Sequence, residues 1–262
     1  MKRLALRALL AGATLSAPLS SAGAQTHVYQ LNHSFADQLG GPALTPTAGG
    51  VFNPTGGYSF ANQGLTLSGV FGQGAYSSGS YSIVFNSIIT DVASGSEYQK
   101  LVDFKDLSQY AGYYAATDGQ VAGTPYYQSA LSPLFDEYGT SGAYISGQLH
   151  KTILTYDNSG ANGVFTAYLD GLAQLSFTDI LGDAAFSPAG IAHFFESNVP
   201  GDATIGSVYY LATYNYAMDA RQVASYQDVP DVTSTPEPAS VVLLGTGLLG
   251  VLGAARRRRN FA

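Results

Sequence analysis

The side chains best suited to acid–base chemistry in this sequence are three glutamates, Glu97, Glu137 and Glu196. Glycoside hydrolysis needs two carboxyl groups at a set separation on either side of the scissile bond. Two acids at alternate positions of one strand could form such a pair, because they share one face. None of the three glutamates is followed two residues later by an aspartate. We therefore assign no catalytic residues.

Motifs for other chemistry are also absent from the sequence. It contains no G-x-S-x-G elbow, no H-E-x-x-H pair, no G-x-x-x-x-G-K-[ST] loop and no cysteine. His150 and His193 lie at or in expected strands. A histidine in a strand is more often a hydrogen-bonded packing residue than a ligand. We predict that both are structural.

Aspartates near expected loops are the candidate metal ligands, because Ca²⁺ prefers carboxylate and carbonyl oxygens. The candidates are Asp157, Asp170, Asp179, Asp183 and Asp202. Asp157 does not begin an EF-hand loop, since Ala161 stands at the third ligand position. Asp170 precedes Gly171 and is first expected to be a hairpin turn residue. A loop-bound Ca²⁺ is a candidate cofactor without an assigned ligand set, and the metal-binding residues stay unknown.

Tyrosines gather in one part of the chain. They are Tyr110, Tyr113, Tyr114, Tyr126, Tyr127 and Tyr138. Aromatic faces can stack on sugars, but tyrosines on strands also line cores and form cross-strand pairs. The chain has no Trp, the favoured stacking residue. We favour a core role over a binding role for this group.

The elements that would position these residues are strands. The 262 residues include 31 Gly and 19 Tyr, and only 11% are charged, which favours strands and turns over helices. Short apolar runs at 81–89, 99–104, 112–116, 152–156, 164–169, 173–177, 191–195 and 207–214 predict strands. Asp118-Gly119 and Asp170-Gly171 predict hairpin turns, and Asp219 is the expected N-cap of a short helix. The fold class is therefore all-β, an antiparallel β-sandwich or jelly roll.

The order of these runs resembles the LamG-like, concanavalin A-like jelly roll. The likeness is carried by residues 81–85 with 100–104, by 150–157 with 164–171, and by 206–214 with Met218-Asp219. It covers roughly residues 80–227. Hydrolases of this shape carry an E-x-D-x-x-E strand, which this chain lacks. In this family the last strand of the domain often carries an acid. Here Tyr209 and Tyr210 occupy those positions, so the resemblance does not imply a cation site near this strand.

The first 24 residues are typical of a secretory signal peptide. They begin with a basic segment that contains Lys2, Arg3 and Arg7. The apolar stretch 4–15 follows, and it is shorter than the ~20 residues of a spanning helix. Ala22 and Ala24 form an A-x-A cleavage site, so the mature chain is expected to begin at Gln25.

Positive charge is concentrated at the two ends of the chain. Residues 26–235 hold four basic and 17 acidic residues, a net charge of −13. Nucleic-acid binders use basic patches, so we do not expect nucleic acid as a partner. An acidic body suits cations or neutral ligands such as glycans.

The tail places three features in order. Pro236, Glu237 and Pro238 come first, and the apolar run 239–255 follows. A basic cluster then consists of Arg256, Arg257, Arg258 and Arg259. The apolar run is predicted to form a transmembrane helix, and the arginines are predicted to stay in the cytoplasm.

This tail resembles the PEP-CTERM sorting signal of Gram-negative bacteria, which is associated with exopolysaccharide and biofilm. By that resemblance, the membrane enzyme exosortase recognises Pro236, Glu237 and Pro238 and cleaves nearby. The body would be anchored in the inner membrane on the periplasmic side, and would reach the cell surface or the medium after processing. A plain membrane anchor is the alternative.

These features divide the chain into a signal peptide (1–24), a LamG-like β-sandwich (25–227), a linker (228–235) and a sorting signal (236–262). We predict a non-enzymatic surface or extracellular-matrix protein that binds a polysaccharide or a surface protein. The alternatives are a secreted carbohydrate-active enzyme on the same scaffold and a plainly membrane-anchored surface protein.

Overall fold

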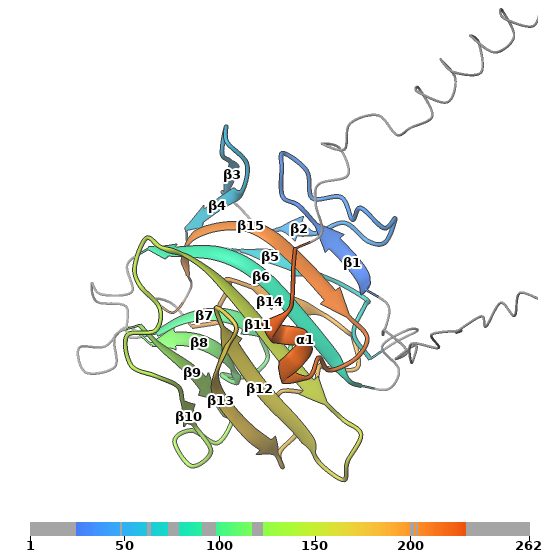
Figure 1. Cartoon of the computed structure of the whole chain (residues 1–262), viewed down its shortest axis with the longest axis vertical. Helices are drawn as coiled ribbons and strands as arrows, with labels where there is room; N and C mark the ends of the chain where they lie inside the picture. Colours follow the sequence, from blue (N-terminus) through green and yellow to red (C-terminus); the bar gives the residue numbers. More distant parts are fainter. Residues whose placement is uncertain are drawn as a thin grey trace, which may run out of the picture.

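The computed structural model describes residues 25–228, except 48, 62–63, 73–78, 91–97, 117–122, 200–201 and 203. In this part, strands β1 to β15 form two antiparallel sheets that pack face to face (Figure 1). The expected all-β sandwich is confirmed. Glu97, the Asp118-Gly119 turn, the signal peptide with Ala22 and Ala24, and the tail from 236 lie outside the described residues.

The first sheet contains the longest strands. Its order is β13 (Leu172–Asp179), β12 (Gly163–Leu169), β11 (Leu149–Asp157), β6 (Tyr81–Thr90), β15 (Ile205–Tyr214), β4 (Tyr58–Ala61) and β3 (Val51–Phe52). β1 (Gln25–Tyr29) also pairs with β15. The β12–β13 hairpin turns at Asp170 and Gly171, whose φ angles are 51° and 82°. These positive angles are those of a tight hairpin turn, as the Asp-Gly dipeptide predicts.

The second sheet has shorter strands. Its order is β10 (Glu137–Tyr138), β9 (Thr124–Gln128), β8 (Gly112–Ala116), β7 (Tyr98–Asp103), β14 (Ala192–Phe194), β5 (Leu65–Leu67) and β2 (Thr45–Pro46). The eight strands expected from the sequence correspond to β6, β7, β8 and β11 to β15. The others were missed because most are very short, and β2 and β9 contain a proline.

The space between the sheets is filled by aromatic side chains. Tyr113 and Tyr127 belong to this main core, whereas Tyr114 and Tyr126 form a separate buried cluster with Tyr98. The split follows from the alternation of side chains along a strand. The core role expected for the tyrosines is confirmed for these four, but Tyr110 and Tyr138 are exposed.

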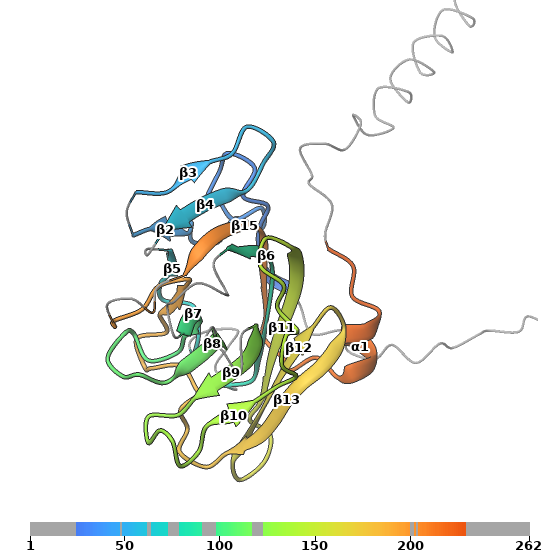
Figure 2. The same ribbon diagram turned by 90° about the vertical axis from the view of Figure 1, so that its left-hand side faces the viewer.

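The outer side of the first sheet is covered by helix α1 (Ala220–Ala224), which Figure 2 shows beside β11 and β12. Val223 packs there with Tyr210 and Tyr214. The expected cap is confirmed, since Asp219 Oδ1 accepts the Gln222 N–H at 2.8 Å. Among the described residues, no helix is both long and apolar enough to cross a membrane. The predicted helix 239–255 lies outside them.

Candidate binding pocket

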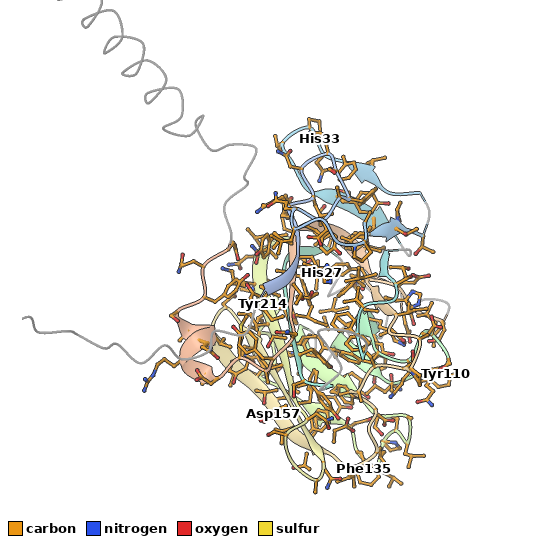
Figure 3. The ribbon with its side chains drawn as sticks, turned by 90° about the vertical axis from the view of Figure 1, so that its right-hand side faces the viewer. His27, His33, Tyr110, Phe135, Asp157 and Tyr214 are labelled. Atoms are coloured by element: carbon orange, nitrogen blue, oxygen red, sulfur yellow. The ribbon has the colours of Figure 1, made fainter. Side chains whose placement is uncertain are left out.

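One end of the sandwich carries a small, open pocket with a cavity volume of about 50 Å³. It lies where the β9–β10 loop, residues 129–136, meets the end of β13 and the turn at 180–183. Its aromatic lining is Tyr127, Phe135 and Phe177, and its acids are Glu137, Asp179 and Asp183. Figure 3 places Phe135 at the end of the molecule opposite His33.

Two of the acids hold the pocket's framework together. Asp183 Oδ2 accepts hydrogen bonds from Ser129 Oγ at 3.1 Å and from the Ala130 N–H at 2.9 Å. Asp179 accepts the backbone N–H groups of Asp183 and Ala184, both at 2.9 Å. Both acids are buried. Asp183 Oδ2 therefore joins the two loops, and Asp179 holds the turn that carries Asp183.

A lysine supports the same turn from behind. Lys105 Nζ donates to the carbonyl oxygens of Gly182 at 2.7 Å and Ala185 at 2.6 Å. Burial lowers the pKa of Lys105, and the charges of Asp183 and Asp179 partly oppose that shift. Lys105 does not line the pocket, so its charge stabilises the turn and is not presented to a ligand.

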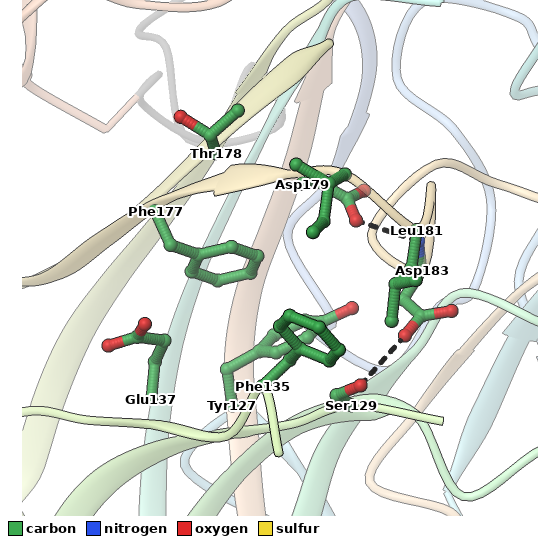
Figure 4. A pocket seen from close by; sticks show the side chains of 10 residues that line it. Tyr127, Ser129, Phe135, Glu137, Phe177, Thr178, Asp179, Leu181 and Asp183 are labelled. Atoms are coloured by element: carbon green, nitrogen blue, oxygen red, sulfur yellow. Dashed lines mark hydrogen bonds between the residues drawn. The ribbon is translucent and has the colours of Figure 1, made fainter. Parts of the chain in front are cut away.

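Two polar groups at the pocket have no partner among the described residues. The Glu137 side chain is exposed and forms no hydrogen bond or ion pair there. The Tyr127 hydroxyl is buried and has no hydrogen-bond partner. Figure 4 shows Glu137 on one side of the pocket, Asp179 and Asp183 on the other, and the three aromatic rings between them. Burial, followed by the charges of Asp179 and Asp183, raises the Tyr127 pKa, so its hydroxyl keeps its proton.

Exposed apolar side chains lie on the two loops that form the pocket, and three of them, Phe135, Ile180 and Leu181, line it. The full set is Leu131, Leu134, Phe135, Ile180 and Leu181. Leu134 is 78% exposed and Ile180 is 56% exposed. Contiguous exposed apolar patches are candidate contact surfaces for another molecule.

His150 has the structural role expected from the sequence. It is buried, and its Nε2 accepts the Ile145 N–H at 3.0 Å. Nδ1 must therefore carry the proton, which it donates to Asp170 Oδ2 at 2.7 Å. Asp170 thus closes the hairpin and also orients the histidine.

His193 is also structural, as expected, and lies between two carboxylates. Asp106 Oδ1 is 2.9 Å from Nε2, and Glu196 Oε2 is 3.1 Å from Nδ1. Burial opposes the charged imidazolium, but the bonds to Glu196 and Asp106 outweigh it and raise the His193 pKa. Burial likewise opposes the charge of Glu196, yet His193 and Thr47 lower its pKa. Glu196 and Glu137 therefore belong to different sites.

The aspartates proposed as calcium ligands are not brought together as a set. Asp179 and Asp183 meet at the pocket, whereas Asp170 binds His150, and Asp157 accepts the Ser159 N–H at its own turn. In the part of the chain that the structure describes, no group of three or more His, Asp or Glu side chains is arranged to hold a metal ion. Sequence reasoning did not single out Phe135 and Phe177, because their relation to Glu137 depends on tertiary contacts.

The tail and the fold were compared with known proteins. Residues 234–259 match the PEP-CTERM protein-sorting motif. This motif implies an exported protein that is processed by exosortase and carries a C-terminal membrane anchor before processing. No curated protein matches the sequence.

Several solved structures share the fold. One is domain 4 of AbnA, a GH43 extracellular arabinanase from Geobacillus stearothermophilus, in complex with arabinotriose; it is 16% identical with a TM-score of 0.55, over 77% of this chain and 97% of that chain. Another is the botulinum neurotoxin serotype D binding domain, which is 9% identical with a TM-score of 0.55, over 76% of this chain and 50% of that chain. A third is a mutant Trypanosoma rangeli sialidase displaying trans-sialidase activity, which is 13% identical with a TM-score of 0.55, over 76% of this chain and 32% of that chain. At these identities the likeness shows the fold alone, a β-sandwich.

Proposed function

We propose that this is an exported surface or extracellular-matrix protein that is processed by exosortase and binds a glycan in the pocket between β9–β10 and β13. The observation that carries the proposal is the unpartnered Glu137 carboxylate beside the rings of Phe135 and Phe177. A sugar offers C–H faces that pack on aromatic rings and hydroxyl groups that donate to a carboxylate. Pockets that combine an apolar lining with a few polar groups are typical ligand sites.

Binding fits this pocket better than catalysis. A glycoside hydrolase needs two carboxyl groups that both reach the substrate. Here Asp179 and Asp183 are buried and already accept backbone hydrogen bonds, which leaves Glu137 alone in the open. The AbnA domain in complex with arabinotriose supports the view that such a sandwich can hold a saccharide.

The sorting steps complete the proposal. Signal peptidase would cleave after Ala24, so that the mature chain would start at Gln25. Exosortase would recognise Pro236, Glu237 and Pro238, while the four terminal arginines hold the end of the chain inside the cell. The linker would begin at Asp228, which Lys151 holds against the body. The released body would join an exopolysaccharide or biofilm matrix of a Gram-negative cell.

Sorting is tested by Pro236→Ala combined with Glu237→Ala. We expect the body to stay in the inner-membrane fraction, because the recognised tripeptide is lost. The control is Val232→Ala with Thr233→Ala, which lies just upstream of the matched residues. Unchanged processing of the first variant would contradict exosortase recognition and leave a plain anchor.

Glycan binding is tested by polysaccharide pull-down with the full chain in detergent, with and without EDTA. We expect Phe135→Ala to weaken binding about tenfold, which corresponds to about 1.4 kcal/mol. Leu172→Ala is the matched control, since Leu172 is exposed but does not line the pocket. Loss of binding in EDTA would assign a role to Ca²⁺, and no binding in either condition would refute the glycan proposal.

A further inference from the structure

The polar lining of the pocket is acidic or neutral. It consists of carboxylates and hydroxyl groups, and no lysine, arginine or histidine is among the lining residues. The nearby Lys105 is occupied by the carbonyl oxygens of Gly182 and Ala185. The body around it carries a net charge of −13 over residues 26–235. The potential inside the pocket is therefore negative, which repels acidic ligands.

The acids of the pocket differ in what they can offer a ligand. Both oxygens of Asp179 and Oδ2 of Asp183 accept hydrogen bonds from backbone N–H groups or from Ser129. They contribute charge, but few free acceptor positions. Glu137 keeps both of its oxygens available on the opposite side. A positive group on the ligand would therefore be placed at Glu137.

A second observation points to a ligand independently of the acids. The Tyr127 hydroxyl is buried without a partner, on a side chain that is 1% exposed and lines the pocket. A buried hydroxyl without a hydrogen bond is unfavourable by about 1–3 kcal/mol. A ligand oxygen, or a water held beneath the ligand, would accept its proton.

Building on the proposed function, we infer that the pocket selects glycans that carry a free amino group, in preference to N-acetylated or acidic sugars. The ammonium would lie between the Glu137 carboxylate and the faces of Phe135 and Phe177. Ion pairing and cation–π attraction act together in that position, and both strengthen when water is excluded. N-acetylation removes the charge, and a uronic acid reverses it.

The test measures the affinity of the full chain in detergent by isothermal titration calorimetry at pH 6. The probes are a glucosamine tetrasaccharide, its N-acetylated form and a glucuronate-containing oligosaccharide of the same length. We expect the amino form to bind about tenfold more tightly than the N-acetylated form, or about 1.4 kcal/mol. The acidic form should bind least, and added NaCl should reduce the preference.

Glu137→Gln separates this inference from the proposed function. We expect the variant to lose the preference for the amino form, because a neutral amide cannot pair with an ammonium, while its affinity for the N-acetylated form falls less than its affinity for the amino form. Asp157→Asn is the matched control, because Asp157 is an exposed acid that does not line the pocket. Equal affinities in the wild-type chain, or an unchanged preference in Glu137→Gln, would overturn the inference alone. If no oligosaccharide binds, the proposed function is also wrong.

Discussion

The pocket and the region where the chain leaves the sandwich differ in how their polar groups are paired, although Asn86 Oδ1 at the exit is also buried without a hydrogen-bond partner among the described residues. Near the exit, Asp228 Oδ2 accepts from Asn86 Nδ2 at 2.6 Å, and Lys151 Nζ lies 3.0 Å from Asp228 Oδ1. The Tyr226 hydroxyl is hydrogen-bonded to the hydroxyl groups of Tyr210 and Tyr214. At the pocket, Tyr127 and Glu137 have no such partners among the described residues.

We expect the polar groups at the exit to stabilise the fold and those at the pocket to be available to a ligand. At the exit, hydrogen bonds and an ion pair within the chain hold its last described residues against the first sheet. At the pocket, an unsatisfied hydroxyl and exposed apolar side chains are unfavourable for the chain alone. Such features are expected where a second molecule completes the contacts.

The largest effect is expected from Asp183→Ala, which breaks the framework of the pocket. Ser129 and the Ala130 N–H lose their acceptor, so the free energy of unfolding should fall by about 3 kcal/mol. The melting temperature should fall by roughly 6–12 °C, and glycan binding should be lost. Asp183→Asn keeps one acceptor and should lose less. A fall below about 2 °C would show that the two loops do not depend on this residue.

Tyr226→Phe tests the exit region. It removes the hydroxyl that contacts Tyr210 and Tyr214, and should lower the free energy of unfolding by about 1–1.5 kcal/mol in urea denaturation. Glycan binding should not change. Tyr110→Phe, at an exposed tyrosine, should stay within about 0.5 kcal/mol of wild type. Reduced glycan affinity in Tyr226→Phe would show that the exit region and the pocket are coupled.

A pH series tests a part of the molecule that belongs to neither region. The raised His193 pKa contributes stability that is present below its ordinary pKa of 6.5 and is lost as pH rises through the folded-state pKa. The lowered Glu196 pKa contributes stability that is present above its ordinary pKa of 4.5 and is lost as pH falls. This pair should therefore stabilise the fold most between pH 4.5 and 6.5. Urea denaturation of His193→Gln should lack the loss at higher pH, and an identical pH profile would contradict the assignment.

The smallest effect is expected from Lys151→Met, which removes the ion pair to Asp228 but keeps an apolar chain against Tyr226. Because both charges are partly exposed, the free energy of unfolding should fall by less than about 1 kcal/mol. The difference from wild type should shrink further in 0.5 M NaCl, as screening predicts. A loss above about 2 kcal/mol would mean that the exit depends on this pair.

Local patterns predicted much of the fold. Strands such as β6 and β15 were found because their apolar runs are long, and Asp170-Gly171 and Asp219 were found because turn and cap chemistry is local. β9 and β10 were missed, although they form one wall of the pocket. β9 contains Pro125 and β10 has two residues, so neither has a clear periodic signal.

The sequence by itself determined the sandwich class and the sorting motif, because each depends on residue types close together in the chain. It also predicted that His150 and His193 are structural, but their partners Asp170 and Asp106 come from other segments. The tertiary structure alone decided which acids meet. Glu137 and Asp179 line one pocket only because β10 lies near β13 across the open edges of two sheets. The tertiary structure also decided that the Asp179 and Asp183 carboxylates hold the loops, whereas the Glu137 carboxylate is exposed. A contact between distant segments leaves no local trace in the sequence, so the site is visible only once the two sheets are packed.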